Sequence, residues 1–145
     1  MLSRINNYNF DLAAMTAFEG DTGPYLQYAH ARLCSIHRKT ASLLSADYPK
    51  SVKLSLLSEP HAINLIRVLS QYPDVVQNTL KTQEPTTILT YLFKMSHVLS
   101  SSYDHLRIVG SEQELMEARM ALYDAARGVL GSGMRLLGLS PVERM

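Results

Sequence analysis

The amino-acid sequence predicts an all-α protein, a bundle of helices. Apolar residues recur three and four positions apart over long stretches, and no pair of segments shows the two-residue alternation of paired strands. Prolines stand where several of these stretches begin, which suits the first turn of a helix. The 145 residues, 46% of them hydrophobic and 19% charged, are enough for one globular core.

The first two helices are expected at residues 11–18 and 24–42. Asp11 is favourable at the start of the first, because a carboxylate complements the positive end of a helix dipole. Pro24 lies in the first turn of the second helix. Residues 45–52 are expected to form a loop.

Two shorter helices follow. Ser58 is expected to cap a helix that runs through Tyr72, with Pro60 in its first turn. Pro73 then begins another helix, which ends near Thr82.

A long helix is expected from Glu84 to Gly110, where glycine can adopt the left-handed conformation that ends helices. Residues 111–114 resemble a capping box and begin a last helix that ends near Leu137. We expect these two helices to be antiparallel neighbours. Their apolar stripes comprise Ile88, Leu92, Met95, Leu99, Tyr103 and Leu106 on the first, and Leu115, Ala118, Leu122, Ala125 and Val129 on the second.

Three glycines interrupt the last helix, although each interior glycine costs about 1 kcal/mol of helix propensity. Gly128, Gly131 and Gly133 indicate either close helix packing or a kink.

Composition excludes several classes of protein. No apolar run approaches the length of a membrane-spanning helix, so no membrane association is expected. Cys34 is the single cysteine, which excludes an internal disulfide and a multi-cysteine zinc site and fits a reducing, cytoplasmic compartment. The net charge of +1 does not indicate a general binder of DNA. However, residues 22–53 carry five basic residues and one acidic residue, which suggests a local contact with an anion.

One face of the helix at 24–42 combines aromatic rings with cations. At 100° per residue, Tyr25, Tyr28, Arg32 and Lys39 fall in one sector. Rings that stack on bases and cations that meet phosphates are what binding of an unpaired RNA loop requires. Spacing alone favours a simpler interpretation, two half-buried tyrosines beside ordinary surface charges.

Evidence for catalysis is weak. His30, Cys34 and His37 share another sector of the same helix, but no further ligand or acid stands nearby, so neither a metal site nor a catalytic residue is predicted. Residues 94–97, Lys-Met-Ser-His, imitate a class I aminoacyl-tRNA synthetase signature but lie in the middle of a helix. A hydrolase that uses Cys34 and a histidine is therefore only a rival hypothesis.

Three segments resemble a known family. Residues 18–32 (FEGDTGPYLQYAHAR) look like the opening of the C-terminal anticodon-binding domain of arginyl-tRNA synthetases, and residues 84–94 (EPTTILTYLFK) are similar to a central helix of that domain. Residues 133–145 (GMRLLGLSPVERM) resemble the end of those enzymes, including the terminal methionine. The resemblance covers nearly the whole chain and is closest to fungal forms.

The resemblance implies a helical bundle of the DALR anticodon-binding class. Residues 21–145 would form this domain, and residues 1–20 would connect it to an upstream catalytic domain that is absent here. The implied function is to hold the anticodon loop of tRNA-Arg for an arginine–tRNA ligase. ATP and magnesium would be used only by the parent enzyme, in the cytoplasm or in a mitochondrial form. A helical protein–protein interaction module is the alternative function.

The resemblance also implies particular contacts. Tyr25, Tyr28 and Arg32 on the opening helix, Tyr103 on the long helix and Met145 at the end of the sequence match positions that shape or contact the anticodon loop. The stretch after Leu137 would then dock on the bundle rather than fray, with Val142 packed against it and Arg144 available to a phosphate or to Glu143.

Overall fold

The computed structural model describes residues 11–17 and 20–145, and in them it confirms the all-α prediction: every regular element is a helix. The residues before Asp11, which were interpreted as part of a connection, lie outside this description. The elements in chain order are α1 (Leu12–Thr16), α2 (Gly23–Thr40), the 3-10 turns η1 (Ala41–Leu43) and η2 (Leu54–Leu56), α3 (Pro60–Ser70), α4 (Tyr72–Thr82), α5 (Thr86–Ser102) and α6 (Gln113–Leu136).

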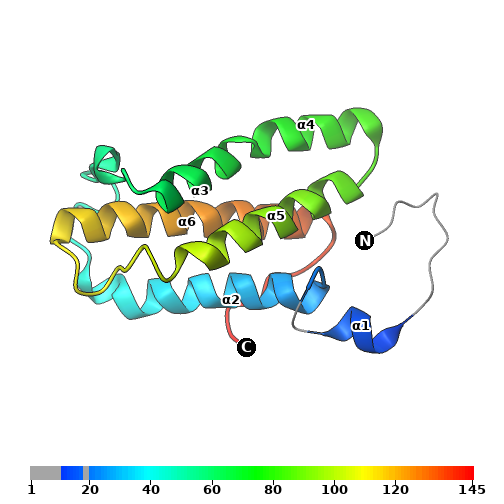
Figure 1. The fold of residues 1–145 in the computed structure, drawn as a ribbon, viewed down its shortest axis with the longest axis horizontal. Coiled ribbons are helices and arrows are strands. Elements are labelled where there is room, and N and C mark those ends of the chain that lie inside the picture. The colour runs from blue at the N-terminus through cyan, green and yellow to red at the C-terminus, as the bar shows by residue number, and fades with distance from the viewer. Residues whose placement is uncertain (1–10, 18–19) are drawn as a thin grey trace.

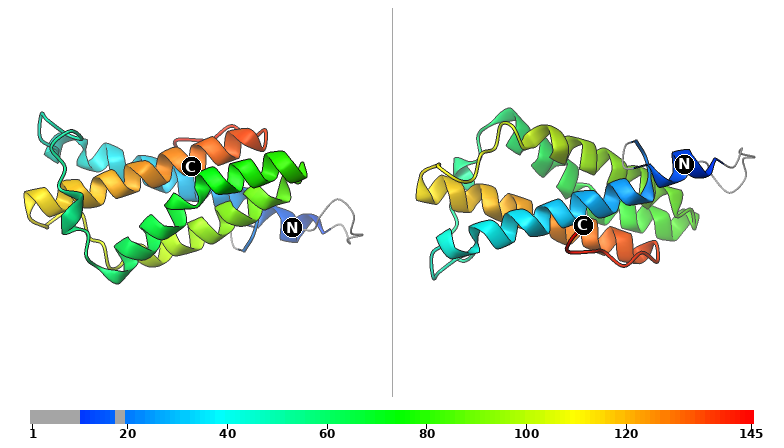
Figure 2. Two further views of the ribbon diagram at one scale, coloured as in Figure 1. Left: turned by 90° about the horizontal axis from the view of Figure 1, so that it is seen from above. Right: turned by 90° about the horizontal axis from the view of Figure 1, so that it is seen from below.

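The helices form a bundle around α5 and α6. Figure 1 shows α2 along the bottom, α3 and α4 along the top, and α5 and α6 between them, running in opposite directions as expected. Helix α6 packs against α2, α3 and α5, and α5 also contacts α2 and α4. The segment after α6 returns beside α2, as the two views in Figure 2 show.

Helix α2 begins where the sequence places a cap and a proline. The Thr22 hydroxyl accepts a hydrogen bond from the Tyr25 backbone N–H at 3.2 Å, and Pro24 occupies the first turn. Leu26 and Leu33 are buried against the bundle, while Tyr28 and Arg32 are exposed. Helix α2 therefore has one core face and one outward face that carries an aromatic ring and a cation.

Helix α5 ends at Ser102, eight residues before the predicted end at Gly110. The Ser102 hydroxyl is buried; it donates to the Leu99 carbonyl at 2.7 Å and lies 3.1 Å from the Tyr123 hydroxyl, so the last turn is tied to α6. Gly110 does adopt a positive φ of 89°, but it does so in the connection that leads into α6. The apolar stripe of α5 is buried as predicted, since Leu106 in that connection still packs into the core.

Both serine caps predicted from sequence are wrong. The N-cap residues are Glu59 for α3 and Glu112 for α6, and neither makes a side-chain capping bond. Ser111 instead accepts a hydrogen bond from Arg119 Nη1 at 2.8 Å, and Arg119 Nε donates to the Glu59 carboxylate at 3.1 Å. The polar side chains at these helix starts therefore join α3 to α6.

Two of the three glycines in α6 permit close packing. A Cβ on Gly133 would lie 2.6 Å from Leu92 Cδ2, and a Cβ on Gly131 would lie 3.2 Å from His30 Nε2. At Gly128 a Cβ would meet nothing within 4 Å. Helix α6 continues through all three positions, so Gly131 and Gly133 mark contact with α2 and α5 rather than an end of the helix. In the same helix Ala125 is exposed and Ala126 is buried, so the predicted stripe was displaced by one residue there.

We expect Gly133→Ala to destabilise the protein by about 1–3 kcal/mol, the usual cost of overpacking a core. Leu92 is fully buried and cannot move aside freely. The matched control is Gly128→Ala in the same helix, which should stabilise it by up to about 1 kcal/mol through helix propensity. Urea unfolding of both variants measures the difference, and equal stabilities would contradict the packing role of Gly133.

The Glu59–Arg119 contact should make stability depend on pH. Burial tends to raise the pKa of Glu59, but hydrogen bonds from Arg119 and the backbone outweigh it, so its pKa is lowered. A lowered pKa in the folded state contributes stability above the unfolded value, roughly pH 4.3, and this contribution is lost as the pH falls through the folded value.

Glu59→Gln should therefore cost about 1 kcal/mol near pH 7, and the difference from the unaltered protein should shrink as the solution is acidified. Urea unfolding over a series of pH values measures this. The exposed Glu143→Gln serves as the control. A difference for Glu59→Gln that stays constant down to the lowest pH would show that its charge contributes nothing.

Candidate nucleic-acid interface

Two hollows flank the outward face of α2. The tail hollow, of about 410 Å³, lies toward the end of the chain and is lined by Tyr28, Ala31, Arg32, Ser35, Arg38, Arg144 and Met145. The connector hollow, of about 350 Å³, lies toward the connection between α5 and α6 and is lined by Arg32, Ser35, Ile36, Lys39, Thr40, Tyr103, Leu106, Arg107, Ile108, Val109 and Tyr123. Arg32 and Ser35 belong to both hollows, so together these form a continuous site across α2.

The tail hollow combines the features expected for binding an RNA base. Tyr28 is 47% exposed, and a tyrosine ring open to solvent can stack on a base. Arg38 and Arg144 add two guanidinium groups, which can hydrogen-bond to phosphate oxygens. Met145 is 65% exposed at the rim. Three predicted residues, Tyr28, Arg32 and Met145, therefore meet around one hollow.

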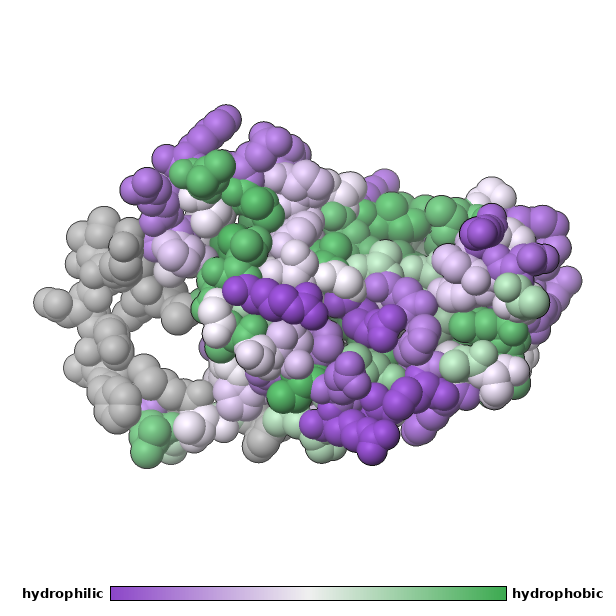
Figure 3. Space-filling model, turned by 180° about the vertical axis from the view of Figure 1, so that it is seen from behind, coloured by the Kyte–Doolittle hydropathy of each residue, from purple (hydrophilic) through white to green (hydrophobic). Residues whose placement is uncertain are grey.

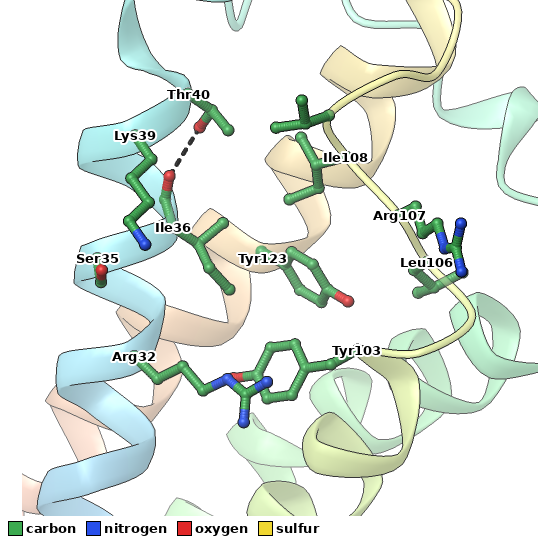
Figure 4. Close-up of a pocket in the computed structure, with 11 residues that line it drawn as sticks. Arg32, Ser35, Ile36, Lys39, Thr40, Tyr103, Leu106, Arg107, Ile108 and Tyr123 are labelled. Carbon is green, nitrogen blue, oxygen red and sulfur yellow. Dashed lines mark hydrogen bonds between the residues drawn. The ribbon is translucent and has the colours of Figure 1, made fainter.

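In the connector hollow, a cation is fixed above a ring. The Arg32 guanidinium carbon lies 4.0 Å from the centre of the Tyr103 ring, as Figure 4 shows. This contact holds the guanidinium in place, and in the part of the chain that the structure describes no carboxylate forms an ion pair with it. Ile36 and Tyr123 form an apolar wall on the α2 and α6 side (Figure 4). Tyr103 therefore supports Arg32 and is only partly open itself.

The Tyr103 hydroxyl stays protonated and buried. Burial raises the pKa of Tyr103 well above its usual range, and the nearby Arg32 charge only partly offsets that effect. Among the residues that the structure describes, this buried oxygen has no hydrogen-bond partner. A buried hydroxyl without a partner is costly in a folded protein. A polar group of a ligand that reached the Tyr103 hydroxyl in the connector hollow would therefore be stabilised by a hydrogen bond.

Tyr25 lies close enough to Tyr103 for the two side chains to interact electrostatically, but it lines neither hollow. Its hydroxyl lies 3.3 Å from Ser100 Oγ and 3.4 Å from His97 Nδ1. His97 Nε2 in turn lies 3.1 Å from an Asp21 carboxylate oxygen. Tyr25 thus contacts α5 from the beginning of α2, and periodicity on α2 alone could not reveal these partners.

The segment after α6, residues 139–145, lies against α2; we call it the C-terminal segment. Gln27, His30 and Arg38 each make a hydrogen bond to its main chain. Val142 is 36% exposed, so the segment docks as expected but without the predicted packing of that side chain. This docking carries Arg144 and Met145 to Tyr28.

Sequence reasoning missed two cations of the site, Arg38 and Arg107, whereas Arg144 was expected to be available to a phosphate or to Glu143. Arg38 and Arg144 join the tail hollow, and Arg107 joins the connector hollow. Arg144 and Arg107 lie far along the chain from α2, and Arg38 falls outside the sector of Tyr28 and Arg32. Only Lys39 was indicated by its position on that face.

Charge pairing separates two classes of arginine. Among the residues described, Arg119 and Arg127 form ion pairs with Glu59 and Asp124, whereas Arg32 and Arg144 appear in none. Figure 3 shows hydrophilic side chains gathered over the lower half of one face, at the level of α2 in Figure 1. The cations that line the two hollows, Arg32, Arg38, Lys39, Arg107 and Arg144, are thus gathered locally in a protein with a net charge of only +1.

The structure gives structural roles to the other candidates. His37 Nδ1 lies 2.9 Å from the Asp124 carboxylate, which also accepts from the Tyr48 hydroxyl at 2.7 Å. Cys34 is buried beside His30. Within residues 11–17 and 20–145, no group of His, Cys, Asp or Glu could hold a metal ion, and no helix is long and apolar enough to span a membrane. Residues 94–97 lie inside α5, as predicted.

Comparisons with known proteins agree with this arrangement. Over 142 residues the chain is 58% identical to the cytoplasmic arginine–tRNA ligase of Saccharomyces cerevisiae and 49% identical to the mitochondrial ligase of the same yeast. Each alignment covers 98% of this chain but only 23% and 22% of the relative, so the chain spans less than a quarter of their length.

Solved structures show the same fold. Arginyl-tRNA synthetase from Thermus thermophilus matches with a TM-score of 0.79 at 29% identity, over 89% of this chain and 22% of that protein. The Plasmodium falciparum enzyme matches with a TM-score of 0.82 at 25% identity, over 99% and 25% respectively. The family model of the DALR anticodon binding domain matches residues 26–145. The resemblance seen in the sequence is thereby confirmed, and the chain belongs to the family of DALR anticodon-binding domains.

Proposed function

We propose that this chain binds the anticodon loop of tRNA-Arg across α2, as the anticodon-binding part of an arginine–tRNA ligase. The observation that carries this proposal is the convergence of Tyr28, Arg32, Arg144 and Met145 on one hollow. These residues come from two ends of the chain and supply both an exposed ring and unpaired cations. Such a combination suits unstacked bases on a flexible phosphate backbone.

Each residue has a distinct part in this proposal. Tyr28 stacks on a base, and Arg32, held over the Tyr103 ring, contacts a phosphate or a base edge. Met145 packs against the stacked base, and Arg144 meets the backbone beside it. Tyr25 contributes indirectly, because it fixes the beginning of α2 against α5.

The rest of the aminoacylation reaction belongs to protein outside this chain. Residues 21–145 form the anticodon-binding domain, and residues 1–20 connect it to a catalytic domain that uses ATP and magnesium to attach arginine to its tRNA. Among the described residues, no group of His, Cys, Asp or Glu could hold a metal ion such as magnesium. The relatives include cytoplasmic and mitochondrial ligases, and the cytoplasm is the proposed location for this chain.

Tyr28→Ala should weaken binding of tRNA-Arg by about 1–3 kcal/mol, the usual worth of one base–aromatic stack. Tyr28→Phe should bind almost normally, since it keeps the ring. Fluorescence titration of the folded variants measures both affinities. Equal affinities for Tyr28→Ala and Tyr28→Phe would remove Tyr28 from the interface.

Arg32→Ala should weaken binding and also reduce its salt dependence. Loss of one phosphate contact on a single strand lowers the slope of log K against log salt by about 0.7. The matched control is Arg67→Ala, an exposed arginine on α3 outside both hollows. An unrelated tRNA measured beside tRNA-Arg separates specific from general attraction. Binding with no salt dependence would favour a protein-interaction module instead.

The 145-residue chain by itself should not catalyse arginine-dependent exchange between ATP and pyrophosphate. This expectation rests on the proposal that the catalytic domain, which would bind ATP, lies outside this chain. Isotope exchange measured with and without arginine is the direct test. Exchange above background would contradict the proposal that the catalytic domain lies outside this chain.

A further inference from the structure

The side-chain amide of Gln27 is paired with the main chain of the C-terminal segment. Its Nε2 donates to the Ser140 carbonyl and its Oε1 accepts from the Val142 N–H, both at 2.9 Å. Pro141, between these two residues, has no N–H to satisfy. One planar amide thus serves two of the polar groups that this stretch directs toward α2, an arrangement that needs a donor and an acceptor in the same side chain.

His30 makes the next contact along the same segment. Its Nδ1 lies 2.8 Å from the Val142 carbonyl oxygen, which can only accept, so Nδ1 carries the proton. The ring is 7% exposed, and its other nitrogen lies against Gly131 of α6, where a Cβ would come within 3.2 Å. The ring is therefore fixed between α6 and the segment.

Few apolar contacts hold the segment beyond Leu139, which packs against the core. Val142 is 36% exposed and Met145 is 65% exposed, so neither side chain anchors the segment. Its position beside Tyr28 therefore depends mainly on polar contacts from α2. Arg38 adds one of these, a bond to the Glu143 carbonyl at 3.0 Å, but it also lines the tail hollow and can meet RNA directly.

We propose that Gln27 and His30 are positioning residues for RNA binding: they hold the C-terminal segment so that Arg144 and Met145 complete the tail hollow. Neither residue lines that hollow, so neither acts by touching the RNA there. This inference rests on the proposed function, and its tests include one readout that needs no RNA.

The first test follows the segment in the absence of tRNA. Hydrogen exchange of the Val142 amide, measured by NMR on the 145-residue chain, should show protection in the unaltered protein. Gln27→Met has similar length and bulk but cannot form either bond, so it should abolish that protection. The control Gln77→Met, an exposed position on α4, should retain it.

The second test measures the affinity for tRNA-Arg. Gln27→Met should weaken binding roughly tenfold, comparable to the loss of one stacking contact. The combined variant Arg144→Ala, Met145→Ala should bind with a similar deficit. Adding Gln27→Met to that variant should cause little further loss, because the side chains that Gln27 positions are already gone.

The third test separates positioning from stability at His30. His30→Asn keeps an N–H donor near the place of Nδ1 but leaves space beside Gly131, whereas His30→Leu fills the buried position without a donor. The thermal stability of the Leu variant should equal or exceed that of the Asn variant. The affinity for tRNA-Arg should follow the opposite order, with Asn the tighter binder.

The outcomes distinguish the two proposals. If the unaltered chain binds tRNA-Arg no better than an unrelated tRNA, the proposed function fails, whatever Val142 shows. If the unaltered chain binds specifically but Gln27→Met retains Val142 protection, or loses protection without losing affinity, the positioning role is overturned. Tighter binding by His30→Leu than by His30→Asn would overturn it as well.

Discussion

The close approach of α2 and α5 to α6 is the constraint on which the rest of this structure depends. It is possible because two positions of α6 have no side chain: Leu92 of α5 occupies the space beside Gly133, and His30 of α2 the space beside Gly131. Each glycine costs helix propensity, about 1 kcal/mol, but the helix remains continuous because its neighbours pack on both sides.

This packing also determines which side chains meet at the tail hollow on the surface. With His30 fixed against Gly131, its Nδ1 faces the Val142 carbonyl, and Gln27 one turn earlier meets the residues around Pro141. The C-terminal segment is thereby aligned with α2, and its cation and methionine reach the exposed ring of Tyr28. The buried contact between His30 and Gly131 therefore helps to determine which side chains line the exposed tail hollow. The connection between them is made by the three hydrogen bonds that Gln27 and His30 form with the C-terminal segment.

The charges of the molecule are distributed in a way that suits an anionic partner. Arg119 and Arg127 are paired with carboxylates and serve to join helices, while Arg32 lies on an aromatic ring that leaves its charge unneutralised. A guanidinium held by a ring loses little conformational freedom when it meets a phosphate, because its position is already defined. In the proposed function, local geometry rather than the net charge of +1 would therefore provide the attraction for RNA.

The sequence by itself determined the fold class, the number and approximate place of the helices, and the outward face of α2. These features follow from periodicity and from prolines at helix starts, which act within a few residues. Caps were less predictable. Ser58 and Ser111 had the residue type and position of caps, but helix ends depend on tertiary partners as well as on local hydrogen bonds.

The composition of the candidate site was decided only by the tertiary structure. Tyr25 shares a helical face with Tyr28, yet His97 and Ser100 of α5 engage it, and no local pattern on α2 contains that information. Arg107 and Arg144 lie far along the chain from α2, and the packing of α5, α6 and the C-terminal segment brings them to the hollows. Local sequence specifies which residues a helix face presents, whereas the meeting of distant side chains depends on how the helices pack together.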